Sequence, residues 1–201
     1  MKGGFNLTRA EIFKNIKYNE DLIKSYQNTI NNLTRRINNL NSQISQLNSQ
    51  SSQLSADISK RTNQINELNR LKSKYESLRN NFGSRQSRRI SKLNQKTSNT
   101  FHLNFIGSYI SGMQSLLSGS EYKSAYNGIS ASIEAVLRKI RGVQNEIDSM
   151  QRSINVRQSN VEQNRREINS CRNQINDING KISYRRQRII YWKNQLRFAK
   201  R

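Results

Sequence analysis

Few side chains in this sequence are suited to acid–base, nucleophilic or metal chemistry. The 201 residues include one histidine, His102, one cysteine, Cys171, and thirteen aspartates and glutamates. His102 stands between Phe101 and Leu103 with no carboxylate or thiol close in sequence. A lone cysteine excludes an intrachain disulfide and a multi-cysteine metal site. We therefore expect a protein that is not an enzyme, with no catalytic residues, no metal and no cofactor.

The residues best suited to binding lie at the C-terminal end, where cations and aromatic residues alternate. The chain has a formal net charge of +22, and its last segment, KISYRRQRIIYWKNQLRFAKR, has no acidic residue. The basic patch that we predict there comprises Arg185, Arg186, Arg188, Lys193, Arg197, Lys200 and Arg201. Such a patch could neutralise phosphates while the rings stack on bases, or lie on an anionic membrane surface. The alternative is a solvated helix face whose apolar neighbours belong to a core.

A seven-residue repeat in the first half of the chain predicts a long coiled-coil helix, the first of the elements that must position the binding residues. Isoleucine at a and leucine at d is typical of coiled coils, and this pattern continues far beyond three or four heptads. The a row reads Ile16, Ile23, Ile30, Ile37, Ile44, Ser51, Ile58, Ile65 and Lys72. The d row reads Asn19, Tyr26, Leu33, Leu40, Leu47, Leu54, Arg61, Leu68 and Tyr75.

The same repeat returns in the second half of the chain with a more polar d row. The a row reads Ile133, Ile140, Ile147, Ile154, Val161, Ile168, Ile175, Ile182, Ile189 and Leu196. The d row reads Val136, Val143, Met150, Arg157, Asn164, Cys171, Ile178, Arg185, Trp192 and Ala199. Two apolar rows of matched length predict two long helices that pack against each other. Cys171 is then a small core residue.

The heptads fail between the two halves. Phe82-Gly83-Ser84 is expected to weaken the first helix, and Lys96–Thr100 (KTSNT) is expected to break it. A short apolar helix should follow from His102 to Leu117, with a turn at Ser118-Gly119. Ser120 is a suitable N-cap for the next helix, and Glu121 falls in its first turn. A helix, a break and a helix of matched length favour a chain that folds back on itself.

These patterns give an all-α fold class, a long antiparallel helical hairpin with a short helix and turn between its arms. We expect an N-terminal segment at 1–15, a first coiled-coil helix at 16–96, a break, short helix and turn at 97–119, and a second coiled-coil helix at 120–201. Only 33% of the residues are apolar, and no proline interrupts the helices. An antiparallel register in which facing residue numbers sum to about 215 places Ser51 opposite Asn164, although a slip of one heptad pairs a with d equally well.

We expect no transmembrane segment, since no run approaches about 20 apolar residues. We also expect no conventional signal peptide, since MKGGFNLTRAEIFKNIKYNED lacks the apolar run and the small-residue cleavage site of one. We therefore expect a cytoplasmic protein, or one that is exported without such a signal.

Apolar residues around the turn form a predicted partner-binding surface. They lie outside the heptad rows and need burial, which either a partner helix or the two long helices could supply. The set consists of Phe105, Ile106, Ile110, Met113, Leu116, Leu117, Gly119, Tyr122 and Tyr126.

The middle of the chain resembles a known group of proteins over roughly residues 60–150. The segment FIGSYISGMQSLLSGSEYKSAYNGISASIEAVLRKI, preceded by INELNRLKSKYESLRNNF, is similar to the small helical WXG-like proteins that accompany LXG toxins of type VII secretion systems. Leu117-Ser118-Gly119 occupies the place of the Trp-x-Gly turn of that family, matching its glycine and not its tryptophan. The resemblance implies a non-enzymatic adaptor that binds the helical domain of an LXG-type toxin and helps to target it for export.

Three classes of function therefore stay open. An adaptor would bind a helical protein partner through the turn region. A nucleic-acid-binding or packaging protein would use the basic patch, with an affinity that falls steeply as salt rises. A structural coiled coil would bind copies of itself through the heptad seam.

Overall fold

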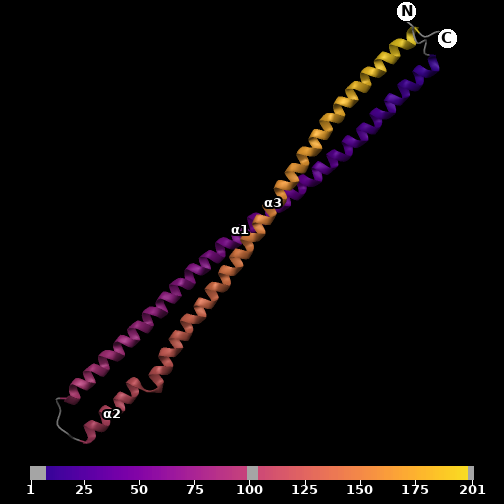
Figure 1. The fold of residues 1–201 in the computed structure, drawn as a ribbon. Coiled ribbons are helices and arrows are strands. Elements are labelled where there is room, and N and C mark those ends of the chain that lie inside the picture. The colour runs from indigo at the N-terminus through magenta and orange to yellow at the C-terminus, as the bar shows by residue number, and fades with distance from the viewer. Residues whose placement is uncertain (1–7, 99–103, 199–201) are drawn as a thin grey trace, which may run out of the picture. The chain divides into compact units, whose positions relative to one another are not determined.

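The computed structural model describes residues 8–98 and 104–198, and the side chains of residues 8–95 and 107–198. Three helices account for these residues: α1 (Arg9–Ser98), α2 (Asn104–Ser118) and α3 (Ser120–Phe198), shown in Figure 1. No strand occurs in the two described ranges. The expected all-α helical hairpin is confirmed.

α1 begins at a capping box. The backbone N–H and the hydroxyl of Thr8 both donate hydrogen bonds to Glu11 Oε2, at 2.8 and 2.9 Å, and the Glu11 N–H donates to Thr8 Oγ1 at 3.3 Å. These bonds satisfy N–H groups that a helix start otherwise leaves unpaired. Because they favour the ionised carboxylate, they lower the pKa of Glu11. The helix therefore includes residues 9–15, which the heptad count placed ahead of it.

α1 passes through Phe82-Gly83-Ser84 without a break, so the predicted weak point does not interrupt it. A glycine inside a helix costs about 1 kcal/mol relative to alanine. Gly83 packs beside tyrosine rings of α3: a Cβ there would lie 3.9 Å from Tyr122 Oη and 4.0 Å from Tyr126 Cε2, which are ordinary van der Waals distances. Packing against another helix thus offsets a poor local propensity. The helix ends at Ser98, inside the predicted Lys96–Thr100 break.

The turn between α2 and α3 depends on Gly119. A Cβ at this position would lie 2.2 Å from the Ser115 carbonyl oxygen, too close for any side chain to fit without movement of the backbone. The Gly119 carbonyl accepts the first helical hydrogen bond of α3, from the Lys123 N–H at 3.2 Å. Gly119 is therefore the N-cap, one residue before the predicted Ser120.

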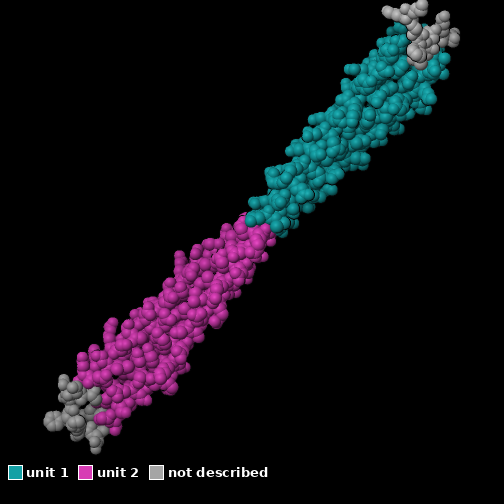
Figure 2. All heavy atoms as spheres, viewed as in Figure 1, with its two compact units in different colours: residues 1–52, 154–201 teal, residues 53–153 magenta. Residues whose placement is uncertain are grey.

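The chain divides into two compact units, coloured separately in Figure 2. Unit 1 consists of Met1–Ser52 and Ile154–Arg201, and unit 2 consists of Gln53–Ser153. In unit 1, Asn19 contacts Arg185 and Gln50 contacts Arg157, so α1 and α3 run antiparallel. In unit 2, Arg61 pairs with Glu146 and Phe82 stacks on Tyr122, which gives the same direction.

The heptad rows form the seam in both units. Every a and d position listed above is buried or half-buried, apart from Ala199, which lies outside the described residues. Among the side chains that the structure describes in each unit, the buried apolar residues of unit 1 are Ile12, Ile16, Leu40, Ile154, Val161, Ile168, Cys171, Ile178 and Ile182. Those of unit 2 are Ile110, Ile133, Val136 and Val143. The expected core position of Cys171 is confirmed, and its exposed fraction is 3%.

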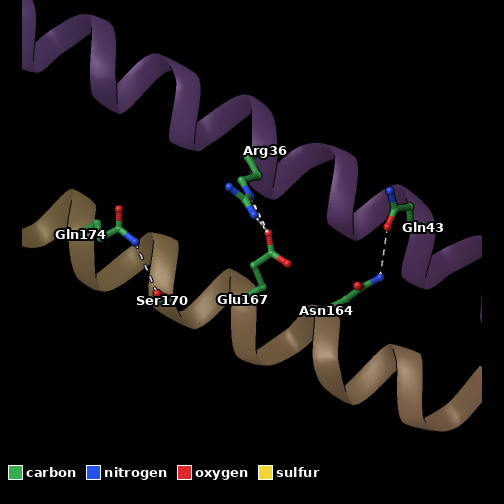
Figure 3. Close-up of polar contacts among 6 residues, drawn as sticks. All are labelled: Arg36, Gln43, Asn164, Glu167, Ser170 and Gln174. Atoms are coloured by element: carbon green, nitrogen blue, oxygen red, sulfur yellow. Dashed lines mark hydrogen bonds and ion pairs between the residues drawn. The ribbon is translucent and has the colours of Figure 1, made fainter.

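The expected register is wrong by about one heptad. Asn164 does not face Ser51; its Nδ2 donates to Gln43 Oε1 at 3.3 Å, and Arg36 pairs with Glu167 on the same side (Figure 3). Arg157 Nε donates to Gln50 Oε1 at 3.1 Å. A shift of one heptad keeps every a row against a d row, so the apolar pattern cannot select between the two arrangements.

Candidate interaction surfaces

The predicted partner-binding residues of α2 divide between its two sides. Ile110 is buried, Met113 and Leu117 are half-buried, and Leu116 is exposed to 59%. The side chains of Phe105 and Ile106 lie outside the described part of the helix. Tyr109, which the sequence analysis did not single out, is exposed to 61%. α2 therefore buries one side and presents Tyr109 and Leu116 on the other.

α2 is held against the end of α1 by side-chain amides. Gln86 Nε2 donates to the Leu117 carbonyl at 2.9 Å, and Gln114 Nε2 donates to Asn94 Oδ1 at 3.1 Å. These contacts agree with the expectation that α2 packs against the long helices. The exposed side of α2 is what stays open to a partner.

Tyr122 and Tyr126 take part in packing within the chain. The rings of Phe82 and Tyr122 lie parallel at 4.9 Å, and those of Tyr122 and Tyr126 lie 6.0 Å apart. Both tyrosines are half-buried. They fix the start of α3 against α1 and so support the surface that α2 presents. Phe82 completes this aromatic cluster. Its position next to Gly83 in the sequence is the feature from which its packing against another helix could have been predicted.

A shallow hollow lies beside the exposed side of α2, where α1, α2 and α3 meet in unit 2. Its lining combines apolar side chains with two arginines and one glutamate: Phe82, Arg85, Gln86, Arg89, Leu116, Leu117, Glu121 and Tyr122. Arg85 and Arg89 are exposed. The hollow therefore suits a partner that brings apolar and acidic groups together.

An exposed apolar edge of α1 belongs to the same unit. Leu71 and Leu78 are exposed to 40% and 50%. They occupy the g position of successive heptads, directly before the a row, and Arg85 of the hollow is the next residue in that series. Because residues seven apart share one face of a helix, these three line one edge of the seam. Because Leu71 and Leu78 lie outside the a and d rows, they were not predicted from the sequence.

The basic patch belongs to unit 1, and its arginines are engaged to different degrees. Arg185 is half-buried in the seam, where its Nη1 donates to Asn19 Oδ1 at 3.4 Å. Arg188 is half-buried against the rings of Tyr191 and Trp192, at 5.1 and 5.2 Å. The exposed members are Arg186, Lys193 and Arg197. Lys200 and Arg201 lie outside the described residues.

A neighbouring lysine, Lys181, pairs with Asp177 at 2.7 Å, and this hydrogen bond raises the pKa of Lys181.

Aromatic residues follow the outer side of α3 beside these cations. Tyr184, Tyr191 and Phe198 are exposed to 54%, 46% and 81%. Their spacing of seven places them along one line of the helix. Trp192, by contrast, is half-buried and contacts Tyr191 edge to face at 5.0 Å. The cations and aromatic residues that alternate in the sequence therefore fall into two groups. Arg185 and Trp192 belong to the seam, and Tyr184, Tyr191 and Phe198 form an exposed line.

Within residues 8–98 and 104–198 no group of three histidine, cysteine, aspartate or glutamate side chains could hold a metal ion. None of the described helices is long and apolar enough to span a bilayer. His102 lies outside the described residues.

Comparison with protein-family models, with curated proteins and with solved structures finds no match to this chain.

Proposed function

We propose that this chain is a non-enzymatic interaction protein that binds an amphipathic helix of a protein partner in unit 2. The observation that carries the proposal is the exposed apolar edge of α1, Leu71 and Leu78, which continues to Arg85 of the hollow. The lining of that hollow includes the exposed Leu116 of α2. The two long helices already cover each other's a and d rows. The residues at this edge are therefore additional to those needed for the hairpin.

Heptad spacing supports a helix as the occupant. Leu71 and Leu78 are separated by one heptad, about 10 Å along the axis, which matches the two-turn heptad repeat of a helix packed alongside. A third helix on this edge would convert a two-helix seam into a three-helix core. It would remove the two leucines and Leu116 from water, where each exposed apolar side chain is unfavourable by roughly 25 cal/mol per Å².

Charge supports an acidic partner. Arg85 and Arg89 are exposed and line the hollow, and the chain as a whole carries +22. Carboxylates on the flank of a partner helix would pair with these arginines and set its position along the groove. The apolar contacts would supply most of the affinity, because exposed ion pairs contribute little.

The most specific form of this proposal is an adaptor of a type VII secretion system. The similarity of residues 60–150 to WXG-like proteins that accompany LXG toxins supports it, and so does the turn at Gly119, which stands where that family has its Trp-x-Gly turn. The partner would be the helical domain of an LXG-type toxin.

The test is a binding measurement between the full chain and the helical domain of an LXG-type toxin, by light scattering and calorimetry. We expect a complex that persists at about 0.5 M salt, where exposed charges are screened. The variant Leu71→Gln, Leu78→Gln, Leu116→Gln should weaken it at least tenfold. A matched control, Val156→Gln, removes an apolar side chain that is exposed to 60% in unit 1 and should leave binding unchanged.

Two results would contradict the proposal. If the triple variant binds as tightly as the original chain, the edge is not the contact surface. If the complex dissociates fully at high salt, charge rather than apolar contact holds it. Circular dichroism of each variant verifies that the helices are retained.

A further inference from the structure

We propose that the outer face of α3 in unit 1 binds the surface of an anionic lipid bilayer. The outer face is defined by four exposed apolar residues, Tyr184, Ile190, Tyr191 and Phe198, which face away from the seam. This contact is independent of the helical partner proposed for unit 2.

The exposure of these residues is unusual for a helix whose core side is already packed. Phe198 is exposed to 81%, Ile190 to 59% and Tyr184 to 54%, whereas Ile182 in the seam of the same segment is exposed to only 6%. Single exposed apolar residues are common on protein surfaces and need no partner. Four of them lie within fifteen residues, and three of these share one line of the helix.

Cations border this face on both sides. With 100° of rotation per residue, Arg188 falls between the aromatic line and the seam on one side. Arg186, Lys193 and Arg197 fall on the other side, next to Ile190, and all three are exposed. No acidic residue occurs from Ile178 to the end of the chain. Such a face can place rings and Ile190 among lipid headgroups while long cationic side chains reach phosphates at its edges.

The shape and the existing ring contacts favour a bilayer over single-stranded nucleic acid. The three aromatic residues are separated by about 10 Å each along the helix, far more than the 3.4 Å step of stacked bases. Guanidinium groups already lie over the rings of Tyr184, Tyr191 and Trp192, at 5.4, 5.1 and 5.2 Å. A convex helix face whose rings already contact guanidinium groups is better matched to a flat headgroup layer than to a strand that must stack its bases.

Tyrosine is well suited to a helix face that enters only the headgroup region of a bilayer. Its ring is apolar and its hydroxyl is polar, so it concentrates at membrane–water interfaces. Gln187 and Asn194 lie between the aromatic line and Ile190, which limits burial to the headgroup region. The contact that we infer is therefore peripheral, and it depends on charge and apolar burial together.

The experiment is co-sedimentation of the full chain with large vesicles of phosphatidylcholine alone, or of phosphatidylcholine with about 30% phosphatidylglycerol, at low salt. We expect binding to the anionic vesicles only. The variant R186Q/K193Q/R197Q should lower the partition coefficient about 100-fold, since each cation near an anionic surface contributes about a factor of five. The charge-matched control R138Q/K139Q/R141Q, from unit 2, should change it less than about threefold.

A second pair of variants separates apolar contact from charge alone. Y184Q/Y191Q/F198Q should lower partitioning about tenfold through lost burial of the rings, whereas F13Q/Y18Q, which removes exposed aromatic residues of α1, should not lower it. F198Q alone, at the most exposed position, is included in case the triple variant loses helix content.

Four outcomes would overturn the proposal. They are equal binding to neutral vesicles, an equal loss in the charge-matched control, unchanged binding of both ring variants, and tighter binding to a 20-nucleotide single strand or duplex than to vesicles. The last result would assign the outer face to nucleic acid.

Discussion

Units 1 and 2 use the same two helices and differ in how completely the seam is closed. Among the described side chains, unit 1 buries nine apolar ones, and its polar seam residues bond across the helices, as Asn19 does with Arg185 and Asn164 with Gln43. Unit 2 buries four of those described, leaves Leu71 and Leu78 exposed beside the seam, and adds α2 and a stack of aromatic rings. Unit 1 thus achieves closure with two helices alone, while unit 2 has an edge suited to another helix.

The two units also differ in where their exposed apolar residues lie relative to the seam. The exposed apolar residues of unit 1 near the end of α3 point away from its closed seam and lie among arginines. In unit 2, Leu71 and Leu78 border the seam itself. A protein partner fits the second arrangement because it can extend the core, and a charged flat surface fits the first.

The largest expected effect tests the closed seam of unit 1. Ile168 is exposed to 4%, and Ile168→Ala should lower the free energy of unfolding by about 3 kcal/mol through lost burial and the cavity left behind. Urea denaturation measures the loss, and amide hydrogen exchange should locate the greatest increase in unit 1. Val156→Ala, at an exposed position of the same unit, should cost less than about 0.5 kcal/mol. Equal losses in the two variants would mean that unit 1 is not closed as described.

The next effect tests the turn that only unit 2 contains. Gly119→Ala places a Cβ against the Ser115 carbonyl oxygen and should lower the free energy of unfolding by about 2 kcal/mol.

Gly128→Ala is the matched control for that variant, because nothing lies within 4 Å of its Cβ position inside α3. It should raise stability by about 0.5 kcal/mol through helix propensity. Thermal unfolding of both variants gives the comparison. If Gly119→Ala is as stable as Gly128→Ala, the turn does not need glycine.

A smaller effect compares the ion pairs that bridge α1 and α3 in each unit. Double-mutant cycles on Arg36 with Glu167 in unit 1, and on Arg61 with Glu146 in unit 2, should each give a coupling energy of about 0.5 kcal/mol, because these side chains are substantially exposed. The coupling should fall as salt rises. A coupling near 3 kcal/mol in one unit would show that charge, rather than apolar packing, sets the register there.

The smallest effect concerns the capping box at the start of α1 in unit 1. Hydrogen bonds from Thr8 lower the pKa of Glu11 below its ordinary 4.5. A carboxyl whose pKa is lower in the folded state stabilises the fold at neutral pH, and this contribution disappears as the pH falls through the lowered value. Protection of the first amides of α1, measured against the intrinsic exchange rate at each pH, should therefore fall in acid. In Glu11→Ala, which removes the acceptor oxygen, the Thr8 amide should be poorly protected already at neutral pH; an identical pH response would remove Glu11 as the cause.

Much of the fold could be predicted because a helix is a local structure with a fixed repeat. The seven-residue spacing of isoleucine and leucine identified which residues face inward, and Ser118-Gly119 identified the turn. The capping box at Thr8-Arg9-Ala10-Glu11 was equally visible in the sequence and was overlooked. The continuity of α1 through Gly83 was not predictable locally, because the tyrosines that pack beside this glycine come from a distant part of the chain.

The candidate surfaces were predicted only in part. The aromatic and basic residues near the end of α3 were recognised as a group, but their division into seam residues such as Arg185 and exposed residues such as Phe198 depends on which side of α3 meets α1. Leu71 and Leu78 were missed because they lie outside the a and d rows. Tyr122 and Tyr126 were assigned to a partner, and they pack on Phe82 of the same chain.

By itself the sequence determined the helices, their inward rows, the turn and the excess of positive charge, since each of these follows from local spacing and composition. Tertiary structure alone decided the register, the placement of α2 along α1, and which apolar residues stay exposed. The physical reason is the repeat itself: a slip of one heptad preserves every a–d contact. Only the pairing of particular side chains across the helices, such as Asn164 with Gln43 and Arg157 with Gln50, distinguishes one arrangement from the next.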